Sequence, residues 1–156
     1  MDDPTTGPTT DVLRQRFEGH LVNLQRMLQL CQQQETQIDK GQTDALMRTL
    51  SAKNPIVQTL ATEAESLRQT LASAAGSLDD SVRRELQRLK GQCESIGATI
   101  LETEQRCESK LVSHRQQISE QIQSMQSGSD ATDRYQQVSD GTGGDRCGSV
   151  LDLQSE

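Results

Sequence analysis

The sequence predicts an all-α protein: an elongated antiparallel helical hairpin, a long third helix in a coiled-coil-like three-helix arrangement, and disordered termini. Apolar residues recur at steps of three and four over most of residues 11–127, as they do along one face of an α-helix. Only 31% of the chain is hydrophobic, with one Phe, one Tyr and no Trp. This composition is too poor in aromatic residues for a compact core, but it suits a narrow seam between long helices.

The longest periodic stretch predicts the third helix, over residues 78–127. Two consecutive steps of four fall around Cys107, a stutter that would unwind a supercoil locally. At about 1.5 Å per residue this helix would be roughly 70 Å long, so its apolar stripe needs another helix to pack against. The stripe consists of Val82, Leu86, Leu89, Cys93, Ile96, Ile100, Thr103, Cys107, Leu111, His114, Ile118, Ile122 and Met125.

The first helix is expected over residues 11–39, after a disordered segment 1–10 that has two prolines and no apolar residue beyond Met1. Thr10 or Asp11 would cap its start, and Gly41 would close its end in a left-handed conformation. Flanking apolar residues make the stripe wide enough for contact with a second helix. The stripe is Leu13, Phe17, Leu21, Leu24, Leu28, Cys31 and Ile38, with Glu35 in one seam position.

The second helix is expected over residues 43–75, capped by Thr43 or Asp44 and folded back beside the first helix by the short turn. Pro55 predicts a kink or a one-residue break at 54–55, because proline lacks the N–H that would bond Ser51. Lys53 occupies one position of the seam. The other positions are Leu46, Leu50, Val57, Leu60, Ala64, Leu67, Leu71 and Ala74.

Residues 128–156 are rich in Asp, Ser, Gly and Gln and predict a flexible tail. Two apolar islands interrupt it, the single Tyr135 and the terminal Val150-Leu151-Asp152-Leu153. Such islands are either short docking elements that order on a partner or chance features of the composition.

Charge and hydropathy exclude several classes of partner. A net charge of −7 and an isoelectric point near 4.9 argue against nucleic acid, which needs a basic surface. No apolar run approaches the roughly 18 residues needed for membrane insertion. The acidic N-terminus lacks the apolar region of a secretory signal, so we expect a cytoplasmic protein.

The chain lacks the residue patterns of a catalytic, metal or cofactor site. His20 has no cysteine or carboxylate at a familiar metal-binding distance in sequence, and His114 lies among stripe residues. Cys31, Cys93 and Cys107 fall on the apolar stripes, and no cysteine forms a C-x-x-C pair, so small buried thiols explain them best. We therefore expect neither an enzyme nor a protein with a cofactor.

Two functional classes remain. One is a binding module whose apolar groove accepts an amphipathic segment of another protein. The other is a structural coiled coil that oligomerises and acts as a spacer. Lys53 and Glu35 at seam positions, with Pro55 and the stutter, favour an interrupted seam over a long uniform filament.

Around the expected first turn, an acidic residue, a glycine-marked turn and a leucine stripe lead to a lysine. The pattern reads Glu35-x-x-Ile38-x-x-Gly41-x-x-x-Ala45-Leu46-x-x-x-Leu50-x-x-Lys53. With this pattern, and with downstream Val57, Leu60, Glu65 and Leu67, residues 13–125 resemble the FlgN-type flagellar export chaperones. In the tail, Tyr135, Gly141 and the Val150 to Leu153 end are similar to features that family members carry after the last helix.

This resemblance implies a cytosolic chaperone that binds hook-filament junction (hook-associated) subunits and delivers them to the flagellar type III export gate. A groove on the third helix would hold the subunit, with packing of the same residues on the first helix as the alternative. Tyr135 would dock on the export gate, and a weak homo-oligomer is possible. The expected partner-binding residues are Ile100, Leu111, Ile118, Ile122, Met125, Tyr135, Val150, Leu151 and Leu153.

Overall fold

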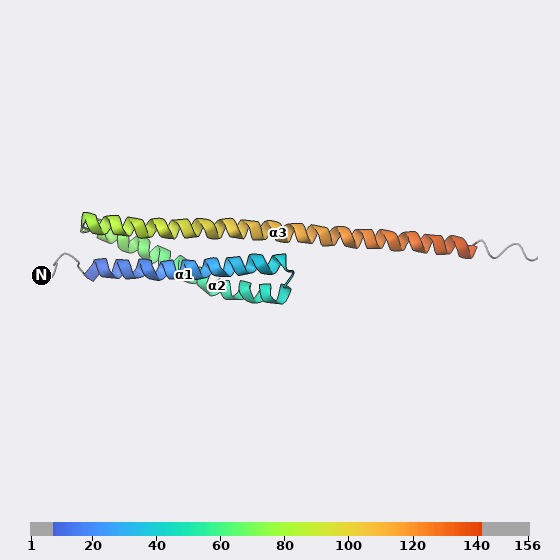
Figure 1. Cartoon of the computed structure of the whole chain (residues 1–156), viewed down its shortest axis with the longest axis horizontal. Coiled ribbons are helices and arrows are strands. Elements are labelled where there is room, and N and C mark those ends of the chain that lie inside the picture. The colour runs from blue at the N-terminus through green and yellow to red at the C-terminus, as the bar shows by residue number, and fades with distance from the viewer. Residues whose placement is uncertain (1–7, 142–156) are drawn as a thin grey trace, which may run out of the picture. The chain divides into compact units, whose positions relative to one another are not determined.

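The computed structural model describes residues 8–141 and is all-α, which confirms the predicted fold class. It contains α1 (Pro8–Asp39), α2 (Thr43–Ala74) and α3 (Asp80–Gly141), shown in Figure 1. No strand occurs within these described residues. The chain divides into two units, 1–111 and 112–156, and each unit is described by itself.

Unit 1 holds α1, α2 and the first part of α3. Within it α1 and α3 lie side by side, and α2 crosses α1 on its way back (Figure 1). The apolar stripes meet in two clusters, one toward each end of the unit. The first is formed by Leu13, Phe17, Leu67, Ala74, Leu86 and Leu89. The second is formed by Met27, Cys31 and Ile56, with Leu30, Leu60 and Ile100 packed against it.

Ion pairs between α1 and α3 show how these two helices are aligned. Arg14 Nη2 lies 2.8 Å from Glu85 Oε2, Arg106 Nε lies 3.1 Å from Glu35 Oε1, and Lys110 Nζ lies 2.8 Å from Asp39 Oδ2. Each pair joins residues 71 positions apart, so the two helices run parallel in one constant register. Along α1 the basic Arg14 precedes the acidic Glu35, whereas along α3 the acidic Glu85 precedes the basic Arg106. A slide of α3 by three heptads would therefore set Arg106 against Arg14.

The turn between α1 and α2 confirms the predicted role of Gly41, which has a φ of 64°. Gln42 N–H bonds to Gln37 C=O at 2.9 Å and Gly41 N–H to Ile38 C=O at 3.1 Å, the two bonds of a Schellman motif. The predicted capping of α2 by Thr43 or Asp44 is wrong. Gln42 stands at the N-cap without a side-chain hydrogen bond, because the Schellman turn leads directly into the helix.

Two helix ends lie well away from the predicted ones, and α2 lacks the break that is one of the two predictions for Pro55. Residues 8–10 belong to α1, since proline is tolerated in a first helical turn. α2 passes through Pro55 without a break. α3 continues past 127 to Gly141, and there the Ser127 and Thr132 hydroxyls donate to carbonyls four residues earlier instead of capping an end. Residues 1–7 and 142–156 lie outside the described part of the chain.

The seam of α2 also changes phase at Pro55. The sequence predicts Val57 in the seam, but Val57 is 49% exposed and Ile56 is buried instead. The step from Lys53 to the next buried residue is therefore three, not four. Helical periodicity allows both steps, so the pattern alone could not decide between neighbouring apolar residues.

Candidate partner-binding surface

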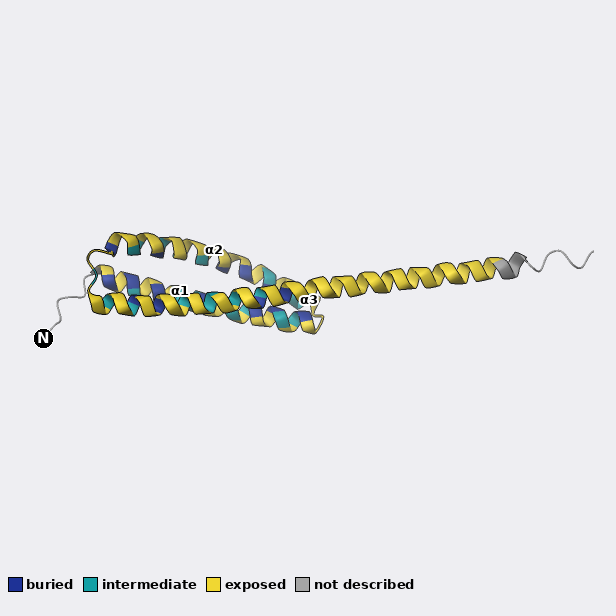
Figure 2. Cartoon of the chain, turned by 90° about the horizontal axis from the view of Figure 1, so that it is seen from above, coloured by how far each residue is buried: buried dark blue, intermediate teal, exposed yellow. Residues whose placement is uncertain are grey.

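Unit 2 carries an exposed apolar stripe. From here on, "the stripe" means only Ile118, Ile122 and Met125 of the longer apolar repeat in α3. Their exposed fractions are 56%, 50% and 72%. Every described side chain from Val112 to Gln137 is exposed, and this stretch of α3 is yellow along its described length in Figure 2. Steps of four and three place the three side chains on one face of the helix.

The surroundings of the stripe are polar and short of charge. A shallow hollow on this part of α3 is lined by Gln117, Glu120, Gln121, Ser124 and Met125. Gln116 Nε2 donates to Glu120 Oε1 at 3.1 Å, which orders one side of the helix surface. The result is an amphipathic helix whose apolar residues face water. Burial of such a face against another apolar surface lowers the free energy of the system.

Two of the predicted binding residues lie in unit 1. Ile100 is half-buried and packs against the second core cluster, beside Met27, Cys31 and Ile56. Leu111 is the last residue of unit 1 and is 41% exposed. The structure thus makes Ile100 an interhelical contact, as the alternative prediction has it, whereas Leu111 stays accessible.

Tyr135 lies in α3, where the sequence predicts a flexible tail. Its side chain is 81% exposed, the largest exposed fraction among the large apolar and aromatic side chains described as exposed. The remaining predicted partner-binding residues, Val150, Leu151 and Leu153, lie outside the described residues.

A polar layer interrupts the core of unit 1. Lys53 is 6% exposed, and its Nζ donates to Gln34 Oε1 at 2.6 Å and also to Glu104 Oε1. Burial alone would raise the pKa of Glu104, but hydrogen bonds from Cys31, Lys53 and Gln34 and the positive charge of Lys53 together outweigh burial and lower it. The sequence indicates this layer through Lys53 in a seam position. The sequence does not indicate its partners Gln34 and Glu104, because the periodicity of one helix does not tell which residues of other helices lie opposite Lys53.

The described cysteines and His20 lie at packing or hydrogen-bonding positions between helices, whereas His114 is exposed. Cys31, Cys93 and Cys107 are free thiols. Burial, followed by the hydrogen bond to the Glu104 carboxylate, raises the pKa of Cys31 to about 12, which keeps this thiol protonated at neutral pH. His20 Nδ1 lies 2.9 Å from Glu63 Oε2, across the α1–α2 contact. No group of residues within 8–141 could hold a metal ion.

Comparison with known proteins identifies the family. The model of the FlgN protein family matches residues 1–140. The chain belongs to the FlgN family. FlgN membership supports a general role as a flagellar export chaperone, in a family of chaperones rather than of enzymes. No curated protein and no solved structure gave a match.

The residues of the central FlgN-like pattern, from Glu35 to Lys53, build one end of unit 1. Glu35 pairs with Arg106 and Lys110, Ile38 is buried, and Gly41 supplies the left-handed turn. Lys53 forms the buried layer described above. The FlgN pattern is thus a pattern of the hairpin and its seam, not of the stripe. None of the helices in residues 8–141 has a segment both long and apolar enough to cross a bilayer.

Proposed function

We propose that this protein is a cytosolic chaperone that binds hook-filament junction subunits through the stripe and delivers them to the flagellar export gate. The observation that supports the proposal is the exposed apolar stripe in a member of a chaperone family. A secreted subunit whose terminal segment forms an amphipathic helix would supply the missing apolar face. Covering that segment would also keep it from assembling before export.

Helix energetics support a role for a partner. An isolated helix in water gains little from its backbone, and most helical stability in proteins comes from packing of an apolar face. Fully burying a side chain such as Ile118 or Ile122 contributes about 1.5–3 kcal/mol. A partner helix laid along the stripe therefore stabilises residues 112–137 as it binds, so helix order and subunit binding are coupled.

Charged residues in the stripe provide the direct test. Ile118→Asp with Ile122→Asp should abolish co-purification with a hook-filament junction subunit, because two carboxylates would have to be buried in the interface. The matched control is Val22→Asp with Leu101→Asp, which adds the same charge at residues of unit 1 that are 61% and 66% exposed. Circular dichroism should report helical proteins in both cases. Unchanged subunit binding by the stripe variant would contradict the proposal.

Tyr135 is the proposed contact with the export gate. Its aromatic ring is exposed and can supply a large contact area at small cost in side-chain entropy. Tyr135→Ala should lower secretion of the junction subunits while leaving their binding to the chaperone intact, and Tyr135→Phe should restore secretion if ring burial is what matters. Loss of subunit binding in Tyr135→Ala would instead assign the ring to the subunit surface.

A structural coiled coil is the alternative function. The same stripe would then pair with a second copy of the chain, and the free protein would sediment as a tight homo-oligomer at micromolar concentration. Deletion of the gene would leave secretion of junction subunits unchanged. A chaperone predicts the opposite pair of results, so sedimentation and a secretion assay distinguish the two functions.

A further inference from the structure

The two halves of α2 are held in unit 1 by very different contacts. In residues 43–54 the buried side chains are Thr49 and Lys53, both polar, while Met47 is 58% exposed. In residues 55–74 the buried side chains include Ile56, Leu67 and Ala74. Ala45, Leu46 and Leu50 of the first half are partly buried but belong to neither core cluster. Apolar burial is the main source of cohesion between helices, so the first half contributes less of it than the second.

Side-chain hydrogen bonds to other helices are divided in the same way. In the second half, Glu63 accepts from Asn23 Nδ2 at 2.7 Å and pairs with His20, and Arg16 Nη1 donates to Ser66 and Thr70. Among the described residues of the first half, Lys53 alone makes such bonds, to Gln34 and Glu104. In the described first half, one buried lysine therefore makes the side-chain hydrogen bonds to other helices, whereas several residues make such bonds in the second half.

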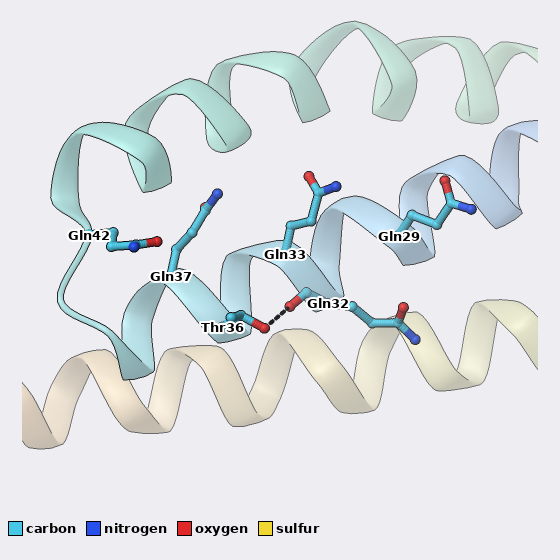
Figure 3. A pocket seen from close by; sticks show the side chains of 6 residues that line it. All are labelled: Gln29, Gln32, Gln33, Thr36, Gln37 and Gln42. Atoms are coloured by element: carbon cyan, nitrogen blue, oxygen red, sulfur yellow. Dashed lines mark hydrogen bonds between the residues drawn. The ribbon is translucent and has the colours of Figure 1, made fainter.

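A hollow lined by glutamines and one threonine lies on α1 beside the first half of α2. Figure 3 shows Gln33 and Gln37 pointing from α1 toward α2. The Oε1 atom of Gln37 is buried and has no hydrogen-bond donor, an arrangement that costs free energy in the closed structure. The hollow is lined by Gln29, Gln32, Gln33, Thr36, Gln37 and Gln42.

The backbone is less firmly held at both ends of residues 43–54. Pro55 has no N–H, so the Ser51 carbonyl loses its usual helical donor and the backbone can bend there with less loss. At the other end, Gln42 provides no side-chain cap and Gly41 already has a left-handed backbone. α1 and α3 remain tied at this end of unit 1, because Glu35 and Asp39 bind Arg106 and Lys110.

We propose that residues 43–54 form a flap that opens as a unit about Pro55 while the rest of unit 1 stays folded. Opening breaks the Lys53 contacts, hydrates Gln37 and uncovers the side of the second core cluster that contains Cys31. The opened state presents apolar side chains of α1 and α3 transiently to water. Unit 1 therefore has a conformational device of its own, which does not depend on the proposed role of the stripe.

Amide hydrogen exchange of the intact protein tests the flap directly. Amides of residues 47–54 should exchange about 100-fold faster than those of residues 60–70 of the same helix, as expected for a local opening. Their opening should also depend only weakly on urea, because little surface is exposed. Equal exchange in both halves, with the urea dependence of global unfolding, would overturn the proposal.

Two substitutions should shift the flap in opposite directions. Lys53→Met removes the side-chain hydrogen bonds that hold residues 43–54 to α1 and α3, so it should speed exchange of residues 47–54 about tenfold. Pro55→Ala restores the donor for Ser51 and should slow the same exchange about tenfold, and both variants should leave residues 60–70 unchanged. Lys90→Met is the matched control, since the Lys90 side chain is 62% exposed. If Lys53→Met fails to fold, Pro55→Ala still decides; no slowing there would count against a hinge at Pro55.

Labelling of Cys31 gives an independent measurement. With Cys93, Cys107 and Cys147 replaced by serine, Cys31 is the single thiol, and it is fully buried in the closed structure. Its reaction with a maleimide should proceed at low urea with a weak urea dependence and should slow about tenfold in Pro55→Ala. Labelling that follows global unfolding alone would show that the flap does not open.

Discussion

α3 carries an apolar repeat through both units, and the two stretches lie in opposite environments. From Leu86 to Cys107 the repeat is buried or partly buried within unit 1, whereas Ile118, Ile122 and Met125 are at least half exposed. The residue types and the spacing are nearly the same in both. Periodicity therefore predicts only that a helix face can pack, and neighbouring helices decide whether that face is buried.

Truncation of side chains in the two environments should give the largest contrast. Phe17→Ala in the buried seam should lower the free energy of unfolding by about 3–5 kcal/mol, because it leaves a cavity. Ile122→Ala in the stripe should change it by less than about 0.5 kcal/mol in the free protein. Urea unfolding followed by circular dichroism measures both. A large cost for Ile122→Ala would mean that the stripe is already packed in the free protein.

Removal of a carboxylate should give the next largest contrast. Glu104→Ala leaves the buried Lys53 without its charged partner and should cost about 1–2 kcal/mol, below the cost for a fully buried pair because the Glu104 side chain is 36% exposed. The matched change Glu120→Ala in the stretch that carries the stripe should be nearly neutral. Equal stabilities of the two variants in urea unfolding would argue against a structural role for the polar layer.

Acid should weaken the packed unit. Hydrogen bonds from Arg106 and Lys110 lower the pKa of Glu35, and the bond from Arg14 lowers that of Glu85. A folded pKa below the unfolded value means that the stabilisation is complete above the unfolded pKa, about 4.3, and is lost as the pH falls through the folded pKa. Urea unfolding at pH 7 and pH 3 should show this loss, and it should shrink in Glu35→Gln.

Surface ion pairs should give the smallest effect. Lys110→Ala removes contacts to Asp39 and Glu35 and should destabilise the free protein slightly at low salt, and less at high salt, because exposed pairs are screened. Arg115→Ala, five residues later in the exposed stretch, should have no measurable effect at either salt concentration. A salt-independent loss in Lys110→Ala would point to packing by its aliphatic stem instead.

The sequence predicts the hairpin well because its signals are local. Gly41 needs only its own backbone freedom to mark the turn, and the stripes of α1 and α2 follow from residues within a few turns of each other. The same locality explains the errors at Thr43, at Val57 and at the end of α3. A cap competes with a neighbouring turn, a seam can step by three or four, and a single glycine costs a helix only about 1 kcal/mol.

The division of the predicted binding residues could not be derived from the pattern. Ile100 and Ile118 have the same chemistry and phase, yet Ile100 packs on the second core cluster and Ile118 is exposed. Which residues of α3 are covered depends on its alignment with α1. That alignment is set by contacts such as Arg14 with Glu85, between residues far apart in the sequence, and helical periodicity carries no information about it.

The constant offset between α1 and α3 has a consequence for how the chain can change in length. Two parallel helices joined at matching points tolerate an insertion in one only when the other gains the same number of residues. Relatives of different size should therefore differ in the turn at 40–42, in the link at 75–79 or after residue 111. Elsewhere, length changes should come in equal pairs, and a lone heptad added between Glu85 and Arg106 should separate Glu35 from its partner.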